Sequence, residues 1–142
     1  MTEPMTQAAK RIAYHYGPPP GTAGGMASVL EAYASLPLQH HVVRVRGTWH
    51  PDTRLHGLPD ALRAAVALLR DPGRADERPV CHVHLSEGGS FLREGGIATL
   101  AGWRHQPVVA SLHGAEIDDF LSAHPRLARA IFRRCDAVVA LG

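Results

Sequence analysis

The sequence holds only two cysteines, a single lysine and no long apolar run, and each scarcity excludes a class of protein. Two thiols are too few for a small secreted domain held together by disulfides. Cys81 and Cys135 both lie in apolar stretches, so we expect reduced core residues in a cytoplasmic protein. No apolar run approaches the roughly 18 residues that a membrane-spanning helix needs. Segment 1–11 is polar and lacks the apolar stretch of a secretory signal.

The length and net charge of the chain further limit the class of protein. A chain of 142 residues is long enough for one domain with its own core, so we treat 1–142 as a single domain. Its net charge of +2 is too small a bias to indicate a nucleic-acid partner. Nearly all of the positive charge is arginine, because Lys10 is the only lysine. Arginine suits phosphate contacts, but this richness follows as readily from genomic base composition.

Strand-like and helix-like segments alternate along the chain. Short β-branched or apolar runs predict strands over residues 11–16, 41–46, 80–85, 108–112 and 136–141. Helical spacing of apolar residues predicts helices over 25–35, from about Pro59 to Leu69, over 91–103 and around Leu127 to Phe132. This order predicts an α/β fold, a Rossmann-like open parallel sheet with helices on both faces. A last strand with no helix after it leaves an exposed edge, so we interpret the chain as one half of a larger protein.

Two of these helices carry specific expectations. Gly95 and Gly96 lie in the middle of the helix 91–103, and each is expected to weaken it by about 1 kcal/mol relative to alanine. The helix after Pro59 carries one apolar stripe, the pattern of a helix that faces a core. The stripe consists of Leu58, Leu62, Ala65, Val66 and Leu69.

The glycine pair Gly24-Gly25 follows the first predicted strand and opens a helix. Bare backbone lets a phosphate approach, and a helix N-terminus offers unpaired N–H groups with a partial positive charge. Such a contact contributes about 0.3–1 kcal/mol, so an anion site here needs further groups. The pair does not fit the G-x-G-x-x-G dinucleotide fingerprint, and the second strand ends in Arg44 and Arg46 instead of an acidic residue. The alternative is that the glycines serve only a tight turn.

His113 directly follows a short apolar strand and precedes Gly114, which permits an unusual backbone turn beside a ligand. A histidine at a strand tip can donate a hydrogen bond to a bound hydroxyl or change its charge near neutral pH. The alternative is a loop histidine that bonds its own backbone. Glu116, with Asp118 and Asp119, either contacts a substrate or caps the helix that follows.

His82 and His84 form an H-x-H pattern whose side chains share one face of a strand. This spacing occurs in zinc sites of barrel-type hydrolases, but such a barrel needs about 250 residues. No second ligand cluster stands out in the sequence. We therefore favour a packed imidazole beneath a covering helix, with His84 approaching the crevice, over a zinc hydrolase.

Four segments together resemble the amino-terminal domain of family 4 glycosyltransferases. They are Gly24-Gly25-Met26, residues 84–93 (HLSEGGSFLR), residues 112–116 (LHGAE) and residues 135–141 (CDAVVAL), in the order expected. The match covers nearly the whole chain. It implies one half of a GT-B fold, in which two Rossmann-like domains face each other across a cleft. Family members transfer a sugar from a nucleotide-sugar donor with retention of configuration, usually without a metal or other cofactor.

The resemblance also implies roles for individual residues. Gly24 and Gly25 would lie near the donor diphosphate, and His113 would lie against the donor sugar and stabilise the reacting centre. We expect no metal ligands. The substrate side of the cleft would be lined by His84, Ser86, Arg93, Gly114 and Glu116.

The second GT-B domain, with its characteristic pair of glutamates, has no counterpart in these residues. We therefore expect a partner C-terminal domain in cis or in trans, and weak or no transferase activity from this chain alone. The other expected partners are a nucleotide-sugar donor and a glycan or lipid-linked acceptor of polysaccharide biosynthesis, with peripheral contact to the inner face of a membrane allowed. The alternative is a non-catalytic module that binds a nucleotide or sugar phosphate.

Overall fold

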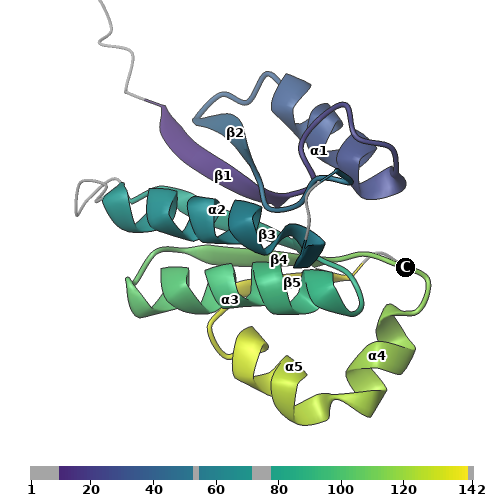
Figure 1. The fold of residues 1–142 in the computed structure, drawn as a ribbon. Coiled ribbons are helices and arrows are strands. Elements are labelled where there is room, and N and C mark those ends of the chain that lie inside the picture. The colour runs from purple at the N-terminus through teal and green to yellow at the C-terminus, as the bar shows by residue number, and fades with distance from the viewer. Residues whose placement is uncertain (1–9, 53–54, 72–77, 141–142) are drawn as a thin grey trace, which may run out of the picture.

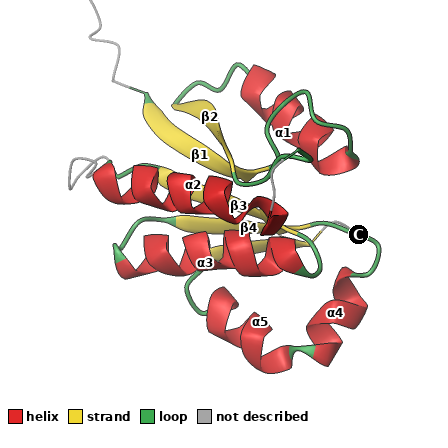
Figure 2. Ribbon diagram, viewed as in Figure 1, coloured by secondary structure: helices red, strands yellow, loops and turns green. Residues whose placement is uncertain are grey.

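A computed structural model describes residues 10–52, 55–71 and 78–140 of the chain. Most of the polar start of the sequence, and Leu141 at the end of the last predicted strand, lie outside the described residues. Figures 1 and 2 show strands and helices alternating as the sequence predicts, except that two helices instead of one separate the last two strands. The elements are β1 (Arg11–Gly17), α1 (Gly25–Ser35), β2 (His41–Gly47), the 3-10 turn η1 (Leu55–Gly57), α2 (Leu58–Arg70), β3 (Val80–Leu85), α3 (Gly89–Trp103), β4 (Val108–Leu112), α4 (Ile117–Ala123), α5 (Pro125–Phe132) and β5 (Ala137–Ala140).

The five strands form one parallel sheet in the order β2-β1-β3-β4-β5, which confirms the predicted α/β fold. From β1 the chain passes to β2 at one edge of the sheet. It then crosses back to β3, on the other side of β1, and continues to β4 and β5, so the strand order reverses between β1 and β3. In open α/β sheets a ligand binds outside the carboxyl ends of the strands at such a reversal. The fold therefore places a crevice beyond the ends of β1 and β3.

Alternating residues of β1 show what covers each face of the sheet. Tyr14 and Tyr16 are buried in one core with Leu68 of α2 and Phe91 of α3. The intervening residue, His15, faces the opposite side, where its ring lies 4.8 Å from that of Tyr33 in α1. Helices α2, α3 and α5 thus pack on one face, with α2 and α3 in front of the sheet in Figure 1, and α1 packs on the other.

The interpretation of the α2 stripe as core-facing is wrong. Among its members, Leu58, Leu62, Val66 and Leu69 are exposed. The residues that α2 buries are Ala61, Ala64 and Leu68. Two alanines let the helix backbone lie close to its neighbours, so a narrow face with small side chains is covered and the larger leucines point outward.

The two glycines of α3 are predicted to respond oppositely to alanine. A Cβ on Gly95 would collide with Cδ1 of Ile131 and lie 3.2 Å from its Cγ1, where α5 packs on α3, whereas a Cβ on Gly96 would meet nothing within 4 Å. Gly95→Ala is expected to lower the free energy of unfolding by about 1–3 kcal/mol through overpacking. Gly96→Ala is expected to raise it by up to about 1 kcal/mol through helix propensity. Urea unfolding of the two variants checks this, and changes of the same sign would contradict it.

The last strand forms the exposed edge that the sequence predicts, since all four residues of β5 are exposed. Both cysteines are free, with Cys81 buried and Cys135 half-buried. Burial raises the pKa of both thiols, and that of Cys135 reaches about 11. Within the described part of the chain, no helix combines the length and apolarity needed to cross a bilayer.

Candidate functional site

A cavity of about 840 Å³ opens beyond the carboxyl ends of the first four strands. Its lining comes from the segment that follows each of them: Gly24 and Gly25 after β1, Trp49 after β2, Ser86 after β3 and His113 after β4. The carboxyl ends of parallel strands meet at one edge of a sheet, so segments far apart in sequence converge there. The glycine pair and the predicted histidine therefore share one cavity.

The glycine pair leaves the backbone at the start of α1 open. Gly24 precedes the helix with a φ of 129°, and no side chain caps this helix end. A Cβ on either Gly24 or Gly25 would meet nothing within 4 Å. The positive φ by itself explains a glycine at position 24, as the tight-turn alternative holds. Gly25 lies outside that backbone region, so the turn does not explain its lack of a side chain.

His113 is held in place from two sides. Its backbone N–H donates to the carbonyl of Leu85 at 2.7 Å, and its Nε2 lies 2.9 Å from Nδ1 of His84. Burial lowers the pKa of His113, so the neutral imidazole is favoured near neutral pH. Gly114 follows with a φ of 101°, and a Cβ there would collide with the carboxylate of Glu87. The strand end, the ring and the turn after it are thus fixed relative to the cavity.

The other predicted site residues divide into those at the cavity and those away from it. Ser86, Arg93 and Gly114 line it. His84 does not, because it is fully buried; its Nδ1 lies 2.9 Å from Nε2 of His113, which does line the cavity. Glu116 is exposed at the residue before α4 and is not among the lining residues; it makes no side-chain cap to that helix.

Sequence reasoning missed Glu94, a buried carboxylate that lines the cavity. The hydroxyl of Thr48 donates to its Oε1, and Nε of Arg93 lies 3.7 Å from the same oxygen. Burial raises its pKa, and the hydrogen bond from Thr48 partly opposes this rise. Helical spacing offered a signal, because position 94 falls on the same face of α3 as the apolar Phe91 and Ala98.

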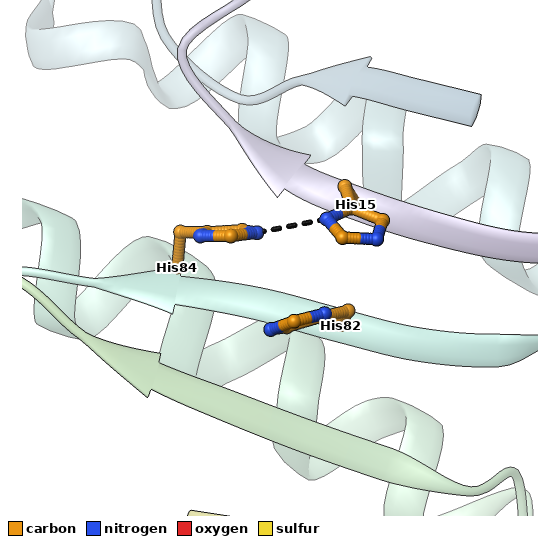
Figure 3. Close-up of side chains that lie close together, drawn as sticks. All are labelled: His15, His82 and His84. Atoms are coloured by element: carbon orange, nitrogen blue, oxygen red, sulfur yellow. Dashed lines mark hydrogen bonds between the residues drawn. The ribbon is translucent and has the colours of Figure 1, made fainter. Parts of the chain in front are cut away.

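Sequence reasoning also missed His15, which joins His82 and His84 in a cluster on the α1 side of the sheet (Figure 3). Nδ1 of His15 lies 2.9 Å from Nε2 of His84, and the rings of His82 and His84 stack at 4.5 Å. Burial lowers the pKa of His15 to about 4, of His82 to about 3 and of His84 to about 2. Neighbouring imidazoles add to the lowering at His82 and His84. All three rings are therefore neutral at neutral pH.

No protein-family model, curated protein or solved structure matches the chain. A function must therefore be inferred from the chemistry of the cleft. Its open helix end and neutral imidazole suit a ligand that combines an anionic group with hydroxyls.

The cleft has little positive charge, which limits the reactions that its own residues can support. Arg93 is the only permanently cationic side chain among the lining residues that the structure describes, and it lies beside the carboxylate of Glu94. Glu87 adds a second carboxylate to the lining. A leaving group that develops negative charge needs preorganised donors or cations. The cleft can hold an anion at α1, but its described lining residues offer little to stabilise such a leaving group.

Proposed function

We propose that the chain is the amino-terminal, acceptor-side half of a retaining GT-B glycosyltransferase similar to family 4, acting with a second domain in glycan or polysaccharide synthesis. One observation carries this proposal: the backbone at Gly24-Gly25 and the imidazole of His113 line one cavity at the reversal point of the sheet. The resemblance in sequence assigns the donor diphosphate to the first and the donor sugar to the second.

Each part of the cleft has a distinct task in this proposal. The N–H groups at the start of α1 receive the donor diphosphate, and the absent side chain at Gly25 allows its close approach. His113 is neutral, and its Nε2 is engaged by His84, so Nδ1 is the ring nitrogen left to bond the sugar. Ser86 and Arg93 lie where an acceptor, glycan or lipid-linked, would enter.

The second domain is needed for the chemistry. The charge that develops on a departing diphosphate has little to oppose it in this cleft, where Arg93 lies beside Glu94. The isolated chain is therefore expected to bind a nucleotide-sugar weakly and to transfer its sugar slowly or not at all. A radiolabelled transfer assay measures this, and robust turnover by the chain alone would contradict the half-enzyme proposal.

A substitution at Gly25 tests whether the backbone there binds a diphosphate or only forms a turn. Gly25→Asp places a carboxylate in the first turn of α1, where the helix dipole favours it, so stability should be kept. The same carboxylate repels a diphosphate, and we expect at least about tenfold weaker binding of nucleoside diphosphate sugars. Gly25→Ala is the uncharged comparison: its methyl occupies the space left for the phosphate but adds no charge, so we expect a smaller loss of binding than with Gly25→Asp. Amide NMR shifts at millimolar ligand report affinity and position, and shifts that avoid Gly24, Gly25 and His113 would overturn the proposal.

The same titrations distinguish the alternative, a non-catalytic module that binds a nucleotide or sugar phosphate. Such a module binds tightly in isolation, and His113→Ala changes its affinity little. In the transferase proposal, His113→Ala removes a contact to the donor sugar. Binding of the nucleotide-sugar is then weakened, while binding of the nucleoside diphosphate alone is unchanged. His40→Ala, at an exposed histidine before β2, serves as the control.

A further inference from the structure

Three imidazoles from two neighbouring strands converge behind the cleft. One nitrogen from each of His15, His82 and His84 lies within 4.8 Å of the other two. Figure 3 shows His15 on β1 facing the two histidines of β3. None of the three lines the cavity described above, so the cluster is a separate feature of the molecule.

The parallel register of the sheet creates this cluster. His15 pairs with His82 across β1 and β3, and side chains two residues apart in a strand share a face. His84 therefore projects on the same side as the other two, beneath Tyr33 of α1. The rings are close, with centroids 4.4 Å apart for His15 and His82. A rigid central pair of strands holds all three.

Hydrogen bonds occupy the outward nitrogens of two of these rings. Nε2 of His82 lies 2.8 Å from Oγ of Ser111, and Nδ1 of His84 lies 2.9 Å from Nε2 of His113. Nδ1 of His82 is the other nitrogen of its ring, and Nε2 of His84 is hydrogen-bonded to Nδ1 of His15, a bond that an ion between the two rings would replace. Metal-bound histidines commonly donate the second ring N–H to such an outer acceptor, and the serine hydroxyl and the His113 ring can both accept.

We infer that His15, His82 and His84 form a binding site for a divalent transition-metal ion of the Zn²⁺ class. Imidazole nitrogens are preferred ligands of these ions, and three histidines leave one position of a tetrahedral ion for water. Zn–N bonds of ordinary length put two such nitrogens about 3.4 Å apart. The observed separations, 2.9 Å for one pair and up to 4.8 Å within the set, lie on either side of this value. Small rotations of the rings would bring the three nitrogens to the separation that a bound ion requires.

The surroundings of the three histidines fit a structural metal ion. His15 and His84 are buried, while His82 is half-buried and gives an ion access from its side. The neutral rings are the form that binds a metal, so protons do not compete near neutral pH. The ion would cross-link β1 and β3 and fix the proton of His84 on Nδ1, facing His113. The proposed sugar transfer needs no metal, and this site does not depend on it.

Metal titration of the intact chain tests the site. The protein is stripped with a chelator, dialysed and titrated with Zn²⁺ by calorimetry, then with Co²⁺ by visible absorption. We expect one ion per chain, a raised melting temperature and the strong visible bands of tetrahedral Co²⁺. His82→Ala should abolish stoichiometric binding. Ser111→Ala, which removes an outer partner but no ligand, should weaken binding by about 10–100-fold.

An exposed histidine outside the cluster provides the control for non-specific metal binding. His40→Ala, at an exposed position outside the cluster, should bind as the unmodified chain does. Failure of the folded, unmodified chain to bind Zn²⁺ stoichiometrically overturns the site whatever the variants do. Binding that is equally strong in His82→Ala and Ser111→Ala also overturns it, because the ion would then lie elsewhere. Circular dichroism confirms that each variant is folded before it is scored.

Discussion

Acidification from pH 6.5 to about pH 4 is expected to lower the free energy of unfolding by several kcal/mol, because three histidines that stay neutral while buried take up protons on unfolding. In the folded chain the pKa is about 4 for His15, about 3 for His82 and about 2 for His84, against 6.5 for an unburied ring. The unfolded chain therefore binds more protons below pH 6.5. Stability is full above that value and is lost as the pH falls.

The size of the effect follows from the number of groups. Each contributes up to about 1.4 kcal/mol per pH unit, so the three together contribute up to about 4 kcal/mol per unit. A typical domain has only about 5–15 kcal/mol of stability, so unfolding is expected between about pH 4 and pH 6. Tyr33, Ser111 and His113 face the cluster from neighbouring elements, and none of them offers a carboxylate that would raise the pKa of these rings.

Urea unfolding at a series of pH values, with a chelator present so that no ion contributes, measures this slope. His82→Gln removes one titrating ring and should reduce the slope by about 1.4 kcal/mol per pH unit. His40→Gln, at an exposed ring outside the cluster, should leave it unchanged. A free energy of unfolding that stays constant from pH 7 to about pH 4.5 would show that the cluster is not buried in solution.

The histidine cluster also marks a limit of sequence reasoning. The H-x-H pattern places His82 and His84 on one face of a strand, and the structure confirms that shared face. No sequence pattern brings His15 beside them, because that contact depends on which strands are neighbours and in what register. Sheet order is a tertiary property, set by how helices pack on both faces. The candidate metal site consequently became visible only in three dimensions.

The cleft was more predictable, for a physical reason. Residues that directly follow parallel strands must gather at one edge of the sheet, whatever the strand order. Gly24, Gly25 and His113 each follow a strand, and they line one cavity. Glu94 lies on a helix, where a single acidic residue within an otherwise apolar face was the only signal. Its partner Thr48 comes from another segment and could not be foreseen.

The two adjacent glycines of α3 have different surroundings. The sequence treats Gly95 and Gly96 alike, yet only the first lies against Ile131 of α5. Helical periodicity likewise marks an apolar stripe on α2 but cannot say whether a neighbour covers it. The described part of the fold covers the face of Ala61 and Leu68 instead. Element boundaries follow from local chemistry, whereas the choice of buried face follows from packing partners.

Two leucines of α2 should therefore differ sharply when each is replaced by alanine. Leu68 is 1% exposed and belongs to the main core, so Leu68→Ala is expected to cost about 2–5 kcal/mol through lost burial and a residual cavity. Leu62 lies on the same helix and is 58% exposed, so Leu62→Ala is expected to change stability by no more than about 0.5 kcal/mol. The chemical change is the same in both, which removes helix propensity from the comparison. Urea unfolding of the two variants measures the difference, and equal losses would mean that the leucine stripe is covered in solution by a surface outside the described residues.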